Sequence, residues 1–208
     1  MGAYWDGRFG REGKIWGMTP SITASYACER FRQEGVRNVL VPGAGYGRNA
    51  LVFARAGFEV TGVEISTGAI KLAAGSGIKL IEGSFLDVPL QPRSFDAIYC
   101  YNVLHLFLES DRRRFVAKSA EALREGGLAF FAVFSDAEAS FGKGGQVEPG
   151  TYESKPGRPV HYFSEGDLVD HFAAFDVLET GVMEDPEEHG EEGKHVHRLR
   201  HVLARRKG

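Results

Sequence analysis

Three glycines at alternate positions after a short apolar run constrain the fold of this chain more than any other feature. The run Val36–Val41 has the character of a buried strand, and a helical pattern occupies Asn49–Ala56. Between them lie Gly43, Gly45 and Gly47. Glycine adopts backbone angles that other residues rarely reach and lets a ligand approach the main chain closely. A strand, a glycine loop and a helix in this order predict a site for a nucleoside ligand.

Strand and helix patterns alternate along the rest of the chain. Five apolar runs bounded by glycine or polar residues are expected to be strands, at 36–41, 58–64, 78–81, 95–101 and 128–134. Helical patterns are found at 20–34, 49–56, 66–74, 110–124 and 164–172. The expected N-terminal caps include Thr19, Ser66, Ser110 and Ser164. Two β-like stretches, 177–183 and 195–204, form a final antiparallel pair.

This alternation predicts an α/β fold. Right-handed crossover connections place successive strands in parallel and put ligands at their carboxyl ends. We expect residues 1–208 to form a single doubly wound Rossmann-like domain, with a mostly parallel seven-stranded sheet and a terminal antiparallel strand. Residues 1–18 are expected to form an aromatic N-terminal arm or lid. Residues 135–163 and 184–194 are expected to be substrate-side loops, because a long stretch without periodicity is often functional.

Composition narrows the class of protein and its partners. The 208 residues are 43% hydrophobic and 25% charged, as in an ordinary globular protein. Lys and Arg number 25 against 28 Asp and Glu, a formal charge of −3 that argues against nucleic acid as a partner. The chain has neither an apolar leader nor a run of roughly 18 apolar residues, so no membrane partner is expected. We expect a cytoplasmic protein, monomeric or a homodimer.

Glu64 is the acid that fits the glycine loop. It ends the second expected strand, about 17 residues after Gly47, where related folds place an acid that binds ribose hydroxyls. Two hydrogen bonds from a ribose diol to one carboxylate are charge-assisted and strong. A dinucleotide-binding oxidoreductase would have a glycine at the sixth position from Gly43, which is Arg48 here. A nicotinamide-dependent oxidoreductase is therefore the alternative rather than the leading interpretation.

The chain resembles class I S-adenosylmethionine-dependent methyltransferases over nearly its full length. The resemblance is carried by the glycine loop 43–49, by Glu64, and by the segments 84–89 and 102–105, in the family's order. More narrowly, Gly47-Arg48-Asn49 and the segments 104–109, 163–168 and 202–206 look like the tellurite-resistance methyltransferase family. The thiopurine and small-thiol methyltransferases are similar at Val41-Pro42 and in the N-terminal tryptophan pattern. The chain departs from most relatives in having Val41 and Ser84 where they carry acids.

The resemblance implies S-adenosyl-L-methionine as the cofactor. The glycine loop would pass under its methionine part, Glu64 would hold the ribose, and Asn102 would lie near the amino-acid or sulfonium end. The full set of expected cofactor contacts is Trp16, Gly43, Ala44, Gly45, Gly47, Asn49, Glu64, Ile65, Ser84, Phe85, Tyr101 and Asn102. Phe85 and Tyr101 could equally be core aromatics, because buried rings dominate packing.

The acceptor side is less well specified. The resemblance points to His189 as a proton acceptor and Arg198 as an anion anchor. Four of the seven histidines lie in 184–201, yet their spacing does not match a metal motif and charge runs are commonly solvated. We therefore expect no metal.

We predict an S-adenosylmethionine-dependent methyltransferase that acts on a small-molecule acceptor. The sequence contains no indisputable general base, which favours a thiol, selenol or chalcogen oxyanion that ionises without help. A non-catalytic S-adenosylmethionine-binding regulator is a further alternative.

Overall fold

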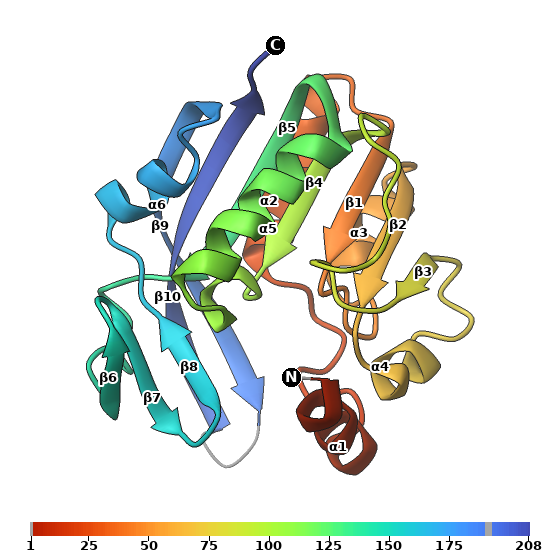
Figure 1. Ribbon diagram of the computed structural model, residues 1–208. Helices are drawn as coiled ribbons and strands as arrows, with labels where there is room; N and C mark the ends of the chain where they lie inside the picture. Colours follow the sequence, from red (N-terminus) through yellow and green to blue (C-terminus); the bar gives the residue numbers. More distant parts are fainter. Residues whose placement is uncertain (1, 190–192) are drawn as a thin grey trace.

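The computed structural model describes residues 2–189 and 193–208, except for the His189 side chain (Figure 1). A seven-stranded sheet runs through the molecule in the order β3-β2-β1-β4-β5-β10-β9. Its strands are β1 (Asn38–Pro42), β2 (Glu59–Glu64), β3 (Lys79–Glu82), β4 (Phe95–Tyr101), β5 (Leu123–Phe134), β9 (Phe175–His189) and β10 (Gly193–Arg206). The first five lie parallel, and β10 is antiparallel to both of its neighbours. The predicted α/β fold is confirmed.

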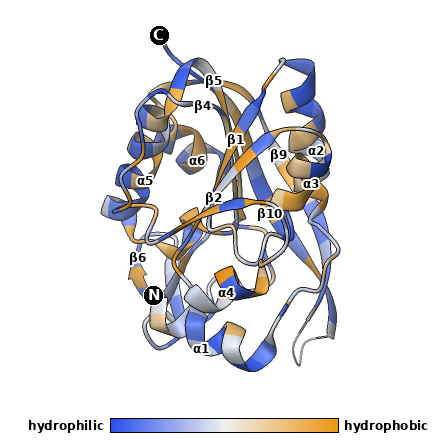
Figure 2. Cartoon of the chain, turned by 90° about the vertical axis from the view of Figure 1, so that its right-hand side faces the viewer, coloured by the Kyte–Doolittle hydropathy of each residue, from blue (hydrophilic) through white to orange (hydrophobic). Residues whose placement is uncertain are grey.

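Helices cover both faces of this sheet. The helices of the domain are α1 (Gly2–Glu12), α2 (Ile22–Gln33), α3 (Ala50–Arg55), α4 (Thr67–Leu72), α5 (Glu109–Ala122), α6 (Glu165–His171) and the 3-10 turn η1 (Leu104–Leu106), and α1 lies beyond the strand ends beside α4. Figure 2 shows α5 and α6 on one side of the sheet and α2 and α3 on the other. No helix in the described part of the chain is both long and apolar enough to cross a membrane.

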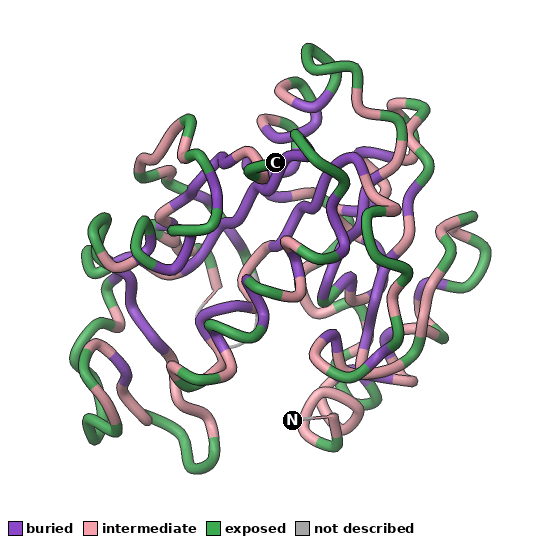
Figure 3. The backbone as a smooth tube through the Cα atoms, turned by 45° about the horizontal axis from the view of Figure 1, so that its top comes forward, coloured by how far each residue is buried: buried purple, intermediate pink, exposed green. Residues whose placement is uncertain are grey.

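The core follows from the period-two alternation of the strands. Ile98 and Cys100 of β4 pack with Phe115 of α5, whereas Ala97 and Tyr99 pack into the cluster that includes helices α2 and α3. Successive strand residues point to opposite faces, so a strand covered on both faces is apolar throughout. Figure 3 shows the buried residues following the central strands, with exposed residues mainly in the outer loops.

Two predicted helix starts are wrong by two residues. The N-terminal cap of α2 is Ser21, whose side chain accepts a hydrogen bond from the Thr23 amide, rather than Thr19. Helix α5 begins at Glu109 instead of after Ser110, because the Glu148 carboxylate accepts from the Glu109 amide at 3.0 Å. A partner distant in sequence thus satisfies the end of the helix that a local cap was expected to satisfy. The predicted caps Ser66 and Ser164 are confirmed.

Three segments predicted as an arm or as loops have regular structure. Residues 2–12 of the expected arm form helix α1. The segment 135–163 contains a separate antiparallel sheet of β6 (Gly145–Glu148), β7 (Thr151–Lys155) and β8 (Arg158–His161). The described part of 184–194 belongs to β9 and β10, whose pairing extends to His189 and Gly193. Whether any of these segments moves as a lid remains a prediction.

A buried arginine joins the small sheet to the main domain. The Arg112 side chain of α5 is 2% exposed, and its two terminal nitrogens lie 2.6 Å from a Glu109 oxygen and 2.7 Å from a Glu148 oxygen. It also donates to the Phe107 carbonyl at 2.7 Å. A guanidinium has several fixed donors, so one side chain can link a helix, a turn and a strand. The position of β6 therefore depends on this one cation.

We expect Arg112→Ala to lower the free energy of unfolding by about 3–5 kcal/mol, because it leaves the partly buried Glu148 carboxylate without its cationic partner. Urea denaturation measures the change. The control is Arg114→Ala on the same helix, whose ion pair with Asp111 is exposed and should be worth less than about 1 kcal/mol. Equal losses in the two variants would contradict this assignment.

Candidate active site

The glycine loop has a left-handed backbone at all three glycines. Gly43, Gly45 and Gly47 have φ angles of 63°, 56° and 88°, which side-chain-bearing residues rarely adopt. A Cβ on Gly43 would lie 2.3 Å from a Val103 methyl carbon. A Cβ on Gly45 would meet no described atom within 4 Å. Gly43 is thus required for packing against the turn after β4, whereas the side of the loop at Gly45 is open.

The Glu64 carboxylate is fixed beside this loop at the carboxyl end of β2. Glu64 is only 5% exposed. Its carboxylate oxygens accept hydrogen bonds from the Gly45 amide at 2.7 Å and from the Ser66 amide at 2.8 Å. Burial raises the pKa of Glu64, although both amides act in the opposite direction. Each carboxylate oxygen has a second lone-pair site. Glu64 can therefore keep both amides while it accepts two further hydrogen bonds.

Asn102, directly after β4, combines an unusual backbone with an unsatisfied side chain. Its φ angle is 53°, and its amide donates to the Ala132 carbonyl at 2.9 Å. Its buried Oδ1 has no hydrogen-bond partner among the described residues. Strained backbone and orphaned buried acceptors concentrate at functional sites. Asn102 thus presents an acceptor at the same edge of the sheet as the glycine loop.

Aromatic residues of the N-terminal segment pack beside the glycine loop. Trp16 stacks on Tyr46 with ring centroids 6.3 Å apart, and lies 6.1 Å from Trp5 and 5.9 Å from Phe9. The Tyr46 hydroxyl accepts from the Trp16 amide at 3.0 Å and donates to the Gly17 carbonyl at 2.7 Å. Buried aromatic rings of this kind contribute large packing energies. Trp16 is therefore held at the rim of the site.

The other predicted cofactor residues have varied surroundings. The Asn49 Oδ1 accepts from the Ser21 amide at 2.9 Å, and the Phe85 ring packs in the core at 4.3 Å from the Phe115 ring. The positions of the Asn49 and Phe85 side chains are therefore explained by contacts within the protein. The Ala44 amide donates to the Val63 carbonyl, the Ile65 side chain lies beside Gly2 of α1, and the Ser84 carbonyl accepts from the amides of Asp87 and Val88. Their contacts with a cofactor remain predictions.

A polar network that the sequence analysis did not identify lies between the glycine loop and β9. The Arg48 guanidinium contacts a Glu187 oxygen at 2.6 Å, and the Tyr101 hydroxyl donates to Glu187 at 3.0 Å and to Asp185 at 2.7 Å. Burial and the two carboxylates raise the pKa of Tyr101. Burial favours the neutral form of Glu187, yet Arg48 holds its pKa below the usual value. The alternation of Asp185 and Glu187 was the available signal, because both point to one face of a strand.

His105 and His197 lie on either side of Phe134, at the end of β5. Their ring centroids are 4.3 Å and 5.0 Å from the Phe134 ring. The His197 Nδ1 lies 3.1 Å from a Glu138 oxygen, and the His105 Nδ1 accepts from the Phe134 amide at 3.4 Å. Burial lowers the pKa of His105 to about 3, with His197 and His161 acting in the same direction. His105 is therefore a neutral packing residue and a weak base.

The predicted catalytic pair is only partly described. The His189 side chain lies outside the described residues. The exposed Arg198 side chain has its Nε 3.6 Å from a Glu184 oxygen. It lines a shallow hollow of about 380 Å³ together with Ala137, Ala139, Glu184 and Val196. Arg198 is thus accessible to an anion, but no geometry joins it to His189.

Family comparison assigns a class to the central part of the chain. Residues 40–131 match the family model described as "Methyltransferase domain". A protein of Geobacillus sp. (strain WCH70) named as a methyltransferase is 30% identical over 114 residues, covering 51% of this chain and 46% of that one. An uncharacterized methyltransferase of Geobacillus thermodenitrificans is 29% identical over 145 residues, covering 67% and 64%. The chain thus spans about half to two thirds of the length of these relatives.

Solved structures share the fold. A protein studied for the conversion of a disulfide bond into a thioacetal group during echinomycin biosynthesis matches with a TM-score of 0.77 and 21% identity, covering 100% of this chain and 92% of that one. Burkholderia thailandensis 1,6-didemethyltoxoflavin-N1-methyltransferase, solved with its substrate and S-adenosylhomocysteine, matches at 0.67 and 22%, covering 99% and 84%. TehB from Haemophilus influenzae matches at 0.67 and 16%, covering 98% and 67%.

Residues 40–131 therefore match a methyltransferase domain, and the whole chain has the fold of solved S-adenosylmethionine-dependent methyltransferases.

We expect stability to fall as the pH is lowered from about 6.5 to about 3, because His105 binds a proton in the unfolded chain but not in the folded one over this range. His105→Asn removes this titration and keeps an oxygen acceptor near the Phe134 amide. The midpoint of thermal unfolding, measured against pH, should therefore fall less steeply in the variant than in the wild type. An unchanged slope would contradict the assignment.

Proposed function

We propose that this protein transfers the methyl group of S-adenosylmethionine to a small anionic acceptor containing sulfur, selenium or tellurium. The binding of S-adenosylmethionine is inferred from the position of the Glu64 carboxylate. The Gly45 and Ser66 amides hold this carboxylate beside an open glycine loop. A carboxylate fixed in this way is prepared to accept both hydroxyls of a ribose without reorganising.

The chain's own residues fit such a cofactor at three further points. Gly45 has open space where a side chain would stand, so a ligand can approach the loop closely. The orphaned Asn102 Oδ1 is a hydrogen-bond acceptor suited to an ammonium group. The Trp16 ring attracts cations, and the Arg8 and Arg48 guanidinium groups already lie 5.5 Å and 5.9 Å from its centre. When bound, the sulfonium supplies an activated methyl group, and the residues named here hold and orient it.

The acceptor half rests on the weakness of the neighbouring bases. Burial raises the pKa of Tyr101 and lowers that of His105, so neither accepts a proton readily near neutral pH. An acceptor that is already ionised needs no base, and alignment alone can lower the barrier by roughly 7–11 kcal/mol. The fold likeness to TehB and to a protein of sulfur chemistry supports the tellurite-resistance or thiol branch. We assign to Arg198 the binding of the acceptor's negative charge. If the acceptor enters as a neutral thiol or selenol, His189 is the group that accepts its proton.

Glu64→Gln should weaken S-adenosylmethionine binding about 10- to 100-fold, as expected from hydrogen bonds to a charged group worth about 1.5–3 kcal/mol. Calorimetric titration measures the affinity. Glu59→Gln, at the exposed start of the same strand, removes the same charge and should bind normally.

Gly45→Ala provides a second variant in case Glu64→Gln unfolds. It adds a methyl group on the open side of the loop at a cost of about 1–2 kcal/mol in backbone strain, so binding should weaken in a chain whose thermal unfolding still shows a cooperative fold. Wild-type affinity in a folded Glu64→Gln protein would refute the proposed cofactor site.

Arg198→Ala should raise the KM for an anionic acceptor about ten-fold, in line with a lost charge-assisted contact, and leave S-adenosylmethionine affinity unchanged. Methylation of thiols, selenite, tellurite, phenols and amines first identifies the acceptor. Arg32→Ala, an exposed cation on α2, is the control. An unchanged KM would exclude Arg198 from the acceptor site, and turnover confined to phenols or amines would exclude the soft-acceptor assignment.

A further inference from the structure

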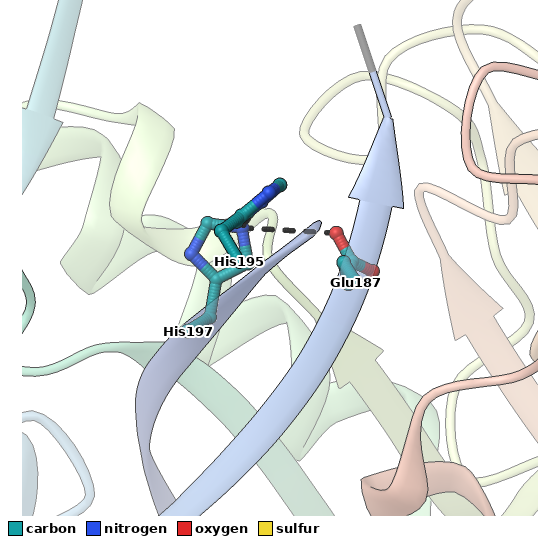
Figure 4. A group of neighbouring side chains, drawn as sticks. All are labelled: Glu187, His195 and His197. Atoms are coloured by element: carbon teal, nitrogen blue, oxygen red, sulfur yellow. Dashed lines mark hydrogen bonds and ion pairs between the residues drawn. The ribbon is translucent and has the colours of Figure 1, made fainter. Parts of the chain in front are cut away.

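The β9–β10 hairpin brings two histidines and a glutamate together. His195 and His197 are alternate residues of β10 and so lie on one face of the strand, and His195 is paired with Glu187 of β9. Figure 4 shows the two imidazoles on β10 and the Glu187 carboxylate on the neighbouring strand. One ligand atom from each of the three residues lies within 4.8 Å of the other two.

The distances between these atoms are close to those of a tetrahedral metal site. The His195 Nε2 and His197 Nε2 are 3.1 Å apart, and the His197 Nε2 is 3.7 Å from the Glu187 Oε2. Two nitrogen ligands about 2.0–2.1 Å from Zn²⁺ at tetrahedral angles are about 3.3 Å from each other. A single cation between the three side chains therefore requires only small movements of their ends.

Neighbouring groups orient both imidazoles for coordination. The His195 Nδ1 lies 3.0 Å from the Gly193 carbonyl oxygen, and the His197 Nδ1 lies 3.1 Å from a Glu138 carboxylate oxygen. Both oxygens are acceptors, so each Nδ1 can carry the hydrogen of its ring. Each Nε2 then has a lone pair for a metal, which would take the place of the hydrogen bond between the two Nε2 atoms. Metal-binding histidines in proteins almost always donate their other ring hydrogen to a carboxylate or backbone carbonyl in this way.

The Glu187 carboxylate is also oriented by neighbouring groups. Its Oε1 accepts from Arg48 and Tyr101, while its Oε2 faces His197. Nearby charges also suit a cation, because among the described residues the network has three carboxylates, of Glu138, Asp185 and Glu187, and the Arg48 guanidinium. Two lone pairs and a carboxylate oxygen therefore converge on one point in a negative environment.

We propose that Glu187, His195 and His197 form a binding site for a divalent first-row transition metal such as Zn²⁺. Two imidazoles and a carboxylate suit these metals, and three protein ligands leave at least one position for water or another molecule. The metal proposal does not rest on the proposed methyl transfer, although Glu187 also contacts Arg48 and Tyr101 beside the glycine loop. This proposal differs from the expectation of no metal that was drawn from the sequence. That expectation used the spacing of the histidines along the chain, and the spacing does not show that β9 pairs with β10.

The test is calorimetric titration of the chelator-treated full-length protein with Zn²⁺, followed by visible absorption with Co²⁺. We expect one Zn²⁺ per chain with micromolar or tighter affinity, and the absorption bands of tetrahedral Co²⁺. Glu138→Gln should weaken Zn²⁺ binding about 10- to 100-fold, because it alters the partner of His197 and leaves all three ligands in place. His195→Gln and His197→Gln each remove a ligand and should weaken it further.

Glu184→Gln is the matched control, because it removes the same charge as Glu187→Gln from an exposed position of the same strand. It should bind Zn²⁺ like the wild type, whereas Glu187→Gln should not. Thermal unfolding without metal identifies any variant that has lost its fold. The proposal is overturned if the wild type shows no saturable Zn²⁺ binding, as expected if a proton is shared between the two rings. Binding that survives both histidine substitutions in folded variants also overturns it.

Discussion

The hydrogen bonds of the Glu64 carboxylate hold together the part of the molecule on which function depends. One carboxylate joins the glycine loop after β1 to the start of α4 after β2, through the Gly45 and Ser66 amides. The ladder between β1 and β2 aligns the two strands, and the buried carboxylate then ties together the loops that follow them. The same carboxylate is left with unused acceptor capacity, which makes the structural contact and the proposed ribose contact compatible.

Much of the fold could be predicted from the sequence because its local patterns agree with its tertiary structure. Apolar runs such as 95–101 are buried on both faces in the structure, and Gly43, Gly45 and Gly47 have the positive φ angles that their spacing indicated. Helix α1 was not predicted, since its sequence contains three glycines, which disfavour helices. Packing of its aromatic residues against Tyr46 outweighs that weak propensity.

The acceptor side could not be predicted for a different reason. The inner faces of β9 and β10 near the hairpin carry Asp185, Glu187, His195 and His197, so the apolar alternation that marks a strand is absent there. Their meaning depends on cross-strand register, which residue spacing alone does not determine. Tyr101 and Asn49 illustrate the same limit, since their hydrogen bonds to distant residues of the protein could not be read from the sequence, and their contacts with a cofactor stay predictions.

The attachment of α1 has a consequence for the dynamics of the domain. Its Asp6 carboxylate accepts from the Ser66 hydroxyl and the Gly68 amide, while the Ser66 amide is bound to Glu64. Detachment of α1 breaks these contacts and its aromatic packing but no strand pairing. Segments of this kind open at a lower free-energy cost than global unfolding. Amide hydrogens of α1 should accordingly exchange with solvent well before those of β4. Because Asp6 binds the first residues of α4, the exchange rate in α1 also measures how often the start of α4 loses these hydrogen bonds.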